Sequence, residues 1–156
     1  MDKRLSLAIV VSYLLLFLAG ITIGAYHLVA SSLGVFEGFT LLFSCILIGG
    51  TGGVLYCLRG AYLNYAVRDQ WSEKWLIWYF IRPIASLICG AVSYAFLKAG
   101  LLVLEAQKES DASNLGFYAL SFIAGMNVDK FIEKIEDLAQ ATWGIGKSRS
   151  SNIKEN

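Results

Sequence analysis

Long apolar runs without charge alternate with short charged windows along the chain. Residues 5–36 carry no charged side chain, 38–58 form a second uncharged run of 21 residues, and 83–104 are interrupted only by Lys98. A fourth uncharged run, 112–128, is the shortest at 17 residues. About 20 apolar residues are needed for a helix to cross about 30 Å of hydrocarbon. The pattern therefore predicts four membrane spans, at about 5–30, 38–58, 83–104 and 112–128.

A polar loop and an aromatic cluster separate the second and third runs. Residues 59–74 carry three basic and two acidic side chains, and the aromatic side chains of the cluster are Trp71, Trp75, Trp78, Tyr79 and Phe80. Tryptophan and tyrosine concentrate at the level of lipid headgroups. We therefore expect an interfacial helix over about 71–81, and we place Pro83 at the first position of the next helix, where its missing N–H costs nothing.

After the fourth run the apolar residues recur at helical spacing, with charged residues on the opposite face. This periodicity predicts an amphipathic helix over 129–143. The remaining residues, 144–156, are rich in glycine, serine and charge, so we expect a flexible tail. The expected fold is all-α: a polytopic transmembrane helical bundle over 1–128, a cytoplasmic amphipathic C-terminal helix and the tail.

The start of the chain, Met1 to Arg4 before an apolar run, is compatible with a signal peptide. The run is longer than the usual apolar core of a signal peptide and leads into further apolar runs, so we expect a retained signal anchor. With four spans, 11 of the 13 basic residues lie on one side of the membrane. Because lysine and arginine concentrate on the cytoplasmic side, both termini are expected in the cytoplasm.

Composition agrees with a membrane protein, since 56% of the residues are hydrophobic and 16% are charged. Average soluble proteins have about 25% charged residues. This composition excludes disorder, a nucleic-acid-binding arm and a secreted disulfide scaffold, and no direct contact with nucleic acid is expected. The three cysteines lie in apolar runs without metal-ligand spacing. No catalytic motif occurs, so we expect neither enzymatic activity nor a cofactor or metal.

Small residues in the first two spans are candidates for close helix packing. Glycines four residues apart allow two helix backbones to approach each other. The packing is either within the chain or at a seam between copies in a homo-oligomer, and we assign the second role as the prediction. The glycines concerned are Gly20, Gly24, Gly49, Gly50, Gly52 and Gly53.

Two basic residues at the ends of the third span are candidates for lipid or ion contact. Lys98 lies near the far end of the span, where it can reach the headgroups, pair with Glu105 or line an ion path. Arg82 precedes Pro83 on the cytoplasmic side, where its guanidinium can bind a lipid phosphate or anchor the helix.

The amphipathic helix is the best candidate for a working surface. Its charges are mixed rather than strongly basic, which favours packing against protein over lying on anionic lipid. The alternatives are packing on the chain's own 59–74 loop, or contact with sister subunits or a soluble partner. The candidate partner-binding residues are Phe131, Ile135, Leu138, Trp143, Arg59 and Arg68.

The second half of the chain carries the residues of a resemblance. The segment from Tyr79 (YFIRPIA) to AGLL at 99–102, followed by FYALSFIAG at 117–125 and a charged helix, resembles small bacterial inner-membrane proteins. The chain also resembles, more loosely, the membrane subunit of the Kiwa anti-phage defence system. That resemblance implies an inner-membrane oligomer that senses infection and works with a cytosolic partner.

These observations predict a non-enzymatic, homo-oligomeric inner-membrane sensor or scaffold that contacts membrane lipids and recruits a cytosolic protein, in anti-phage defence if the resemblance holds. The alternative is a small homo-oligomeric ion channel or pore, lined by serine and threonine hydroxyls of the spans. Such hydroxyls also serve as helix-packing hydrogen-bond donors.

Overall fold

The computed structural model describes residues 3–30, 39–100 and 110–146, which are mostly helical and contain no β-strand. Of the described helices, three are long and apolar enough to cross a membrane. They are α1 (Lys3–Ala30), α2 (Thr40–Tyr62) continued by the π-helical turn η2 (Leu63–Val67), and α3 (Leu76–Lys98) preceded by the 3₁₀ turn η3 (Glu73–Trp75). The expectation of an all-α protein is therefore confirmed over the described residues, and these three helices are suited in length and composition to cross a membrane.

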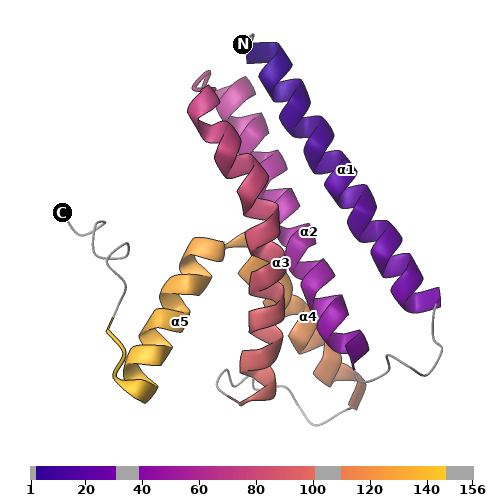
Figure 1. Cartoon of the computed structure of the whole chain (residues 1–156), viewed down its shortest axis with the longest axis vertical. Helices are drawn as coiled ribbons and strands as arrows, with labels where there is room; N and C mark the ends of the chain where they lie inside the picture. The colour runs from indigo at the N-terminus through magenta and orange to yellow at the C-terminus, as the bar shows by residue number, and fades with distance from the viewer. Residues whose placement is uncertain (1–2, 31–38, 101–109, 147–156) are drawn as a thin grey trace.

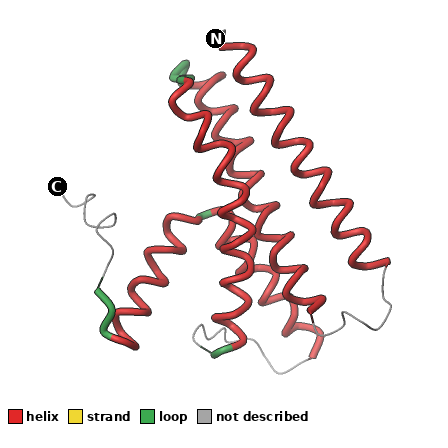
Figure 2. Tube along the Cα trace, in the orientation of Figure 1, coloured by secondary structure: helices red, strands yellow, loops and turns green. Residues whose placement is uncertain are grey.

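Two shorter helices follow. Helix α4 (Ser110–Met126) is apolar over Asn114–Met126, and its 17 residues rise about 25 Å. Helix α5 (Val128–Trp143) begins after a single turn residue, Asn127, so the chain changes direction sharply between them (Figure 2). Gly144 ends α5 in the left-handed conformation, at φ 69°, which glycine adopts without strain.

The helices form a bundle from which α5 diverges (Figure 1). The start of α1 and the α2–α3 connection lie at the same end of the bundle. Two contacts join them: Trp71 Nε1–H donates a hydrogen bond to Ser6 Oγ at 2.7 Å, and Lys3 Nζ lies 3.7 Å from Asp69 Oδ1. Helix α4 ends part of the way along α3, and α5 then turns away from the bundle.

Helix α2 is the centre of the bundle, because it packs against α1, α3 and α4. Where α2 meets α3 and α4, the contacts are made through glycines. A side chain on Gly49 would meet the Ser86 carbonyl oxygen of α3 at 2.7 Å, and one on Gly125 of α4 would collide with the Gly49 backbone. These three helices are therefore close enough for backbone to contact backbone.

Pro83 lies inside α3 and not at the first position of a helix, so that expectation is wrong. The helix begins at Leu76, and the expected interfacial helix and third span are one continuous element over the described residues. Proline inside a helix removes the N–H that would bond the carbonyl four residues earlier and disturbs that turn. The carbonyl that loses this donor is that of Tyr79, and the Tyr13 hydroxyl of α1 donates a hydrogen bond to the next carbonyl, that of Phe80, at 3.1 Å.

Helix α2 with η2 also extends to Val67, beyond the expected end of the second span at residue 58. Residues 59–67 contain Arg59 as their one charged residue, and the apolar and aromatic residues around it continue the helix. The polar connection between α2 and α3 is consequently shorter than the expected loop.

Candidate functional site

A buried arginine lies where α2, α3 and the α4–α5 junction meet. Arg82 is only 4% exposed, although it belongs to an apolar helix. Its guanidinium carbon lies 4.6 Å from the ring centroid of Tyr56 on α2 and 5.1 Å from that of Trp78 on α3. Aromatic faces attract a cation electrostatically, more strongly where water is excluded. The two rings therefore hold the guanidinium group from two helices at once.

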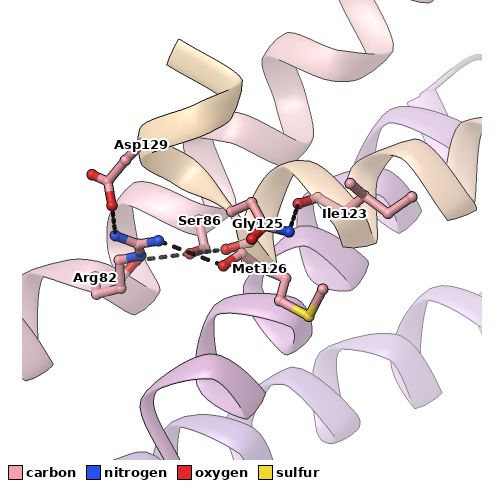
Figure 3. A network of polar contacts seen from close by, with 7 residues as sticks. Arg82, Ser86, Ile123, Gly125, Met126 and Asp129 are labelled. Atoms are coloured by element: carbon pink, nitrogen blue, oxygen red, sulfur yellow. Dashed lines mark hydrogen bonds and ion pairs between the residues drawn. The ribbon is translucent and has the colours of Figure 1, made fainter. Parts of the chain in front are cut away.

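The guanidinium group of Arg82 points to the start of α5 (Figure 3). Its Nη1 lies 2.7 Å from Asp129 Oδ2, in an ion pair that is also a hydrogen bond, and Nη2 donates to the Met126 carbonyl at 3.5 Å. The Asp129 side chain is 61% exposed, so the pair joins a buried cation to a carboxylate in contact with solvent. Among the described residues, Arg82 Nε is buried without a partner.

Ser86 lies one helical turn beyond Arg82 and connects α3 to α4. Its hydroxyl lies within hydrogen-bonding distance of two carbonyl oxygens, 2.9 Å from that of Arg82 and 2.8 Å from that of Gly125 (Figure 3). A side chain on Gly53 of α2 would collide with this hydroxyl. The serine therefore fills the space that the glycine leaves and fixes the end of α4 next to Arg82.

Helix α5 is attached to the bundle mainly through its first turn, where Asp129 meets Arg82. Val128 is buried and Phe131 packs on the small cluster that it forms with Cys89 and Ala124. Farther along, Ile132 is 47% and Trp143 59% exposed. The first turn therefore fixes the direction of α5, and farther along its apolar side chains are partly buried, as at Ile135 and Leu138, or exposed, as at Ile132 and Trp143.

The polar face of α5 carries an ion pair of its own. The Lys130 ammonium donates a hydrogen bond to Glu133 Oε2 at 2.9 Å. This bond and the charge of the glutamate raise the pKa of Lys130 above its ordinary value. The pair lies one helical turn apart on the exposed face, as expected of a solvated helix surface.

The described residues contain no group of three or more histidine, cysteine or acidic side chains that could hold a metal ion. Cys45, Cys57 and Cys89 are all buried with free thiols. The junction holds the Arg82 cation, the Asp129 carboxylate and two aromatic rings together. These contacts fix the point at which α5 leaves the bundle.

The glycines of α2 serve packing within the chain, which was the alternative to an intersubunit seam. Gly49, Gly50, Gly52 and Gly53 are all buried against side chains or backbone of other helices. A Cβ on Gly24 would lie 3.6 Å from the Leu47 side chain of α2, whereas a Cβ on Gly20 would meet nothing within 4 Å. An intersubunit role stays a prediction.

The other candidate residues are dispersed. Lys98 is exposed, with its ammonium 5.7 Å from the Tyr94 ring centroid, and its expected partner Glu105 lies outside the described residues. Ile135 and Leu138 are partly exposed on α5. Arg59 and Arg68 line a cavity between α2 and α3.

Three of the hydroxyls considered as a pore lining, those of Thr51, Ser86 and Ser93, form hydrogen bonds inside the bundle, whereas that of Thr22 bonds the Ala19 carbonyl on an exposed face. Thr51 Oγ1 donates to the Leu47 carbonyl at 2.9 Å, and the Ser93 and Ser121 hydroxyls are 2.8 Å apart. The Thr51 bond lies within α2, whereas the Ser93–Ser121 bond joins α3 to α4, as expected of hydroxyls that pack helices together. No observation in the described part of the chain favours a pore over packing.

Sequence reasoning missed Asp129, Tyr56, Trp78 and Ser86 as members of the junction. A signal for Asp129 exists: an arginine beside an apolar run needs a counter-charge, and Asp129 is the first acidic residue after the fourth run. No comparable signal marks Tyr56 or Ser86, because their contacts depend on how the helices rotate against one another.

Comparison with protein-family models, with curated proteins and with solved structures finds no match to this chain. The resemblance to the Kiwa membrane subunit consequently stays a prediction.

Proposed function

We propose that this chain is a non-enzymatic, four-span inner-membrane protein that forms a homo-oligomer and recruits a cytosolic protein through α5. The observation that carries the proposal is the way α5 leaves the bundle. Its first turn is attached by Arg82, Val128 and Phe131, whereas Ile132 and Trp143 remain exposed farther along. An amphipathic helix with exposed apolar side chains needs a further surface to cover them.

The surroundings of the junction support a position near the cytoplasmic membrane surface. Arg82 lies among Tyr56 and Trp78, and aromatic and basic residues are typical of the headgroup level. Helix α4 is apolar over Asn114–Met126, which rise about 20 Å, less than the hydrocarbon thickness of about 30 Å, and it ends part of the way along α3. Lys3 and Asp69 pair at the end of the bundle where α1 starts.

The charge of α5 favours a protein partner over the lipid surface. Four acidic side chains outnumber two basic ones on this helix: Asp129, Glu133, Glu136 and Asp137 against Lys130 and Lys134. An anionic bilayer repels such a helix, whereas amphipathic helices that bind membranes are rich in lysine and arginine. A protein groove with apolar pockets fits its apolar face better.

A photo-crosslinking amino acid at position 132, in the full chain in its native membrane, tests the proposal. We expect a covalent adduct to one soluble protein, identified by mass spectrometry, and the same protein at position 143. Because an apolar anchor in an interface contributes about 2 kcal/mol or more, Ile132→Glu is expected to lower recovery of that protein by more than about tenfold.

The matched control is the same crosslinker at Ile23, which is as exposed as Trp143 but lies in an apolar span. It should capture lipid or a second copy of the chain and not the soluble protein. Adducts at position 132 that consist only of lipid or of the chain itself would contradict recruitment by α5.

A further inference from the structure

The cavity between the end of α2 and the start of α3 has the composition of an anion site. It has a volume of about 510 Å³. Its charged lining residues, among those described, are Arg59 and Arg68, and the polar ones include Asn64 and Gln70. Three ion pairs of the described residues, Lys3–Asp69, Arg82–Asp129 and Lys130–Glu133, do not include either of these arginines.

Aromatic side chains form the rest of the wall. Trp75, Trp78, Tyr56 and Tyr79 all line the cavity. Asn64 Nδ2 donates a hydrogen bond to the Tyr79 hydroxyl at 3.2 Å, which leaves the hydroxyl hydrogen of Tyr79 as a further donor. The cavity therefore offers several donors and no carboxylate among its described lining residues, and its aromatic walls are suited to a ligand that is apolar on one side.

The location of the cavity indicates the source of the anion. Arg59 lies in the last turn of α2, and η3 with the first turns of α3 provides the opposite wall. Both helices are long and apolar enough to span a membrane, and their ends at the α2–α3 connection coincide with the tryptophans typical of the headgroup level. Basic pockets between spans at this level bind lipid headgroups.

We propose that this cavity binds the phosphate group of an anionic phospholipid, with Arg59 and Arg68 as the phosphate ligands. Arginine matches phosphate geometry through paired N–H donors, and such charge-assisted bonds are among the stronger polar contacts in proteins. Arg82, the residue whose place in the sequence indicates lipid contact, is buried and engaged by Asp129. Lipid contact is therefore assigned to Arg59 and Arg68, the two exposed arginines of the cavity, in place of Arg82.

The experiment uses the full chain in mild detergent with equal fractions of phosphatidylglycerol and phosphatidylcholine, and native mass spectrometry counts the lipid that remains bound. We expect preferential retention of phosphatidylglycerol. The double variant Arg59→Gln/Arg68→Gln should lower that preference about tenfold, since each arginine supplies a charge-assisted bond. Arg4→Gln, which removes an exposed arginine at the same end of the bundle but outside the cavity, should leave it unchanged.

A second variant keeps the proposal testable even if the double arginine variant does not fold. Trp75 is 55% exposed and lines the cavity, so Trp75→Ala should also reduce retention while leaving the helical circular dichroism intact. Displacement of the lipid by millimolar inorganic phosphate would support the same phosphate site with a soluble source. Equal retention in the native chain and the double variant, or an equal loss in Arg4→Gln, would overturn the proposal.

Discussion

Replacing Gly125 with alanine is expected to lower the free energy of unfolding by about 2–3 kcal/mol, the upper part of the range for overpacked cores. A Cβ at this position would collide with the backbone of Gly49, and backbone cannot move aside as a flexible side chain can. The neighbouring Ser86 hydroxyl also depends on the Gly125 carbonyl, 2.8 Å away. Helix α4 would therefore have to separate from α2 and α3 together.

Gly20→Ala is the matched control, because a Cβ there meets nothing within 4 Å. Alanine is a better helix former than glycine by about 0.5–1 kcal/mol, so this variant should be as stable as the native chain or slightly more stable. Thermal unfolding of both variants in mild detergent, followed by circular dichroism, measures the difference. Equal midpoints for Gly125→Ala and Gly20→Ala would show that the interhelical contact at Gly125 is not as close as described.

Asp129→Asn is expected to destabilise the attachment of α5 by about 1–3 kcal/mol, because the buried Arg82 cation loses its counter-charge. This free-energy cost comes from the buried Arg82 and not from Asp129. Asp129 is already 61% exposed, whereas Arg82 is 4% exposed and would keep the two aromatic rings, the Met126 carbonyl and only a neutral hydrogen bond to the asparagine amide oxygen. Amide hydrogen exchange over α5 measures the attachment, and it should become faster by a factor of about ten or more.

Arg82→Met separates the charge from the packing at the junction. Methionine keeps much of the apolar volume, and an apolar replacement of a buried charge is often neutral for stability. We therefore expect Arg82→Met to unfold close to the native midpoint but to exchange α5 amides as fast as Asp129→Asn does. The double variant should recover the stability that Asp129→Asn alone loses. If Asp129→Asn has no effect on either measurement, the ion pair does not hold α5.

The spans can be predicted because apolar length and the absence of charge determine them. The expected spans at 5–30 and 38–58 correspond to α1 and to α2 with its continuation η2, and the amphipathic helix expected over 129–143 corresponds to α5. Hydrophobic length does not determine where a helix begins when apolar residues lie on both sides of a proline. For that reason the sequence pattern places Pro83 at a helix start, although α3 begins seven residues earlier.

The junction can be predicted only in part, because it depends on contacts between distant segments. Arg82 is recognisable in the sequence because it is a charged residue beside an apolar run. A lipid phosphate and a carboxylate are equally suitable partners for an arginine at the expected membrane surface, so the sequence does not distinguish them. The choice of Asp129 follows from the sharp turn at Asn127, which no spacing in the sequence specifies. The glycines are recognisable as packing residues, whereas the helix they pack against follows only from the three-dimensional arrangement.

The side of the membrane on which α5 lies decides whether it can meet a cytosolic protein. Single cysteines at Gln140 and, for comparison, at Asp69 are labelled with a membrane-impermeant maleimide in intact cells and in inside-out vesicles. The native cysteines are buried, so they contribute little background. We expect both positions to be labelled in inside-out vesicles and protected in intact cells. Labelling of position 140 from outside intact cells would place α5 on the opposite side from the α2–α3 connection and would contradict a four-span protein with a cytoplasmic partner surface.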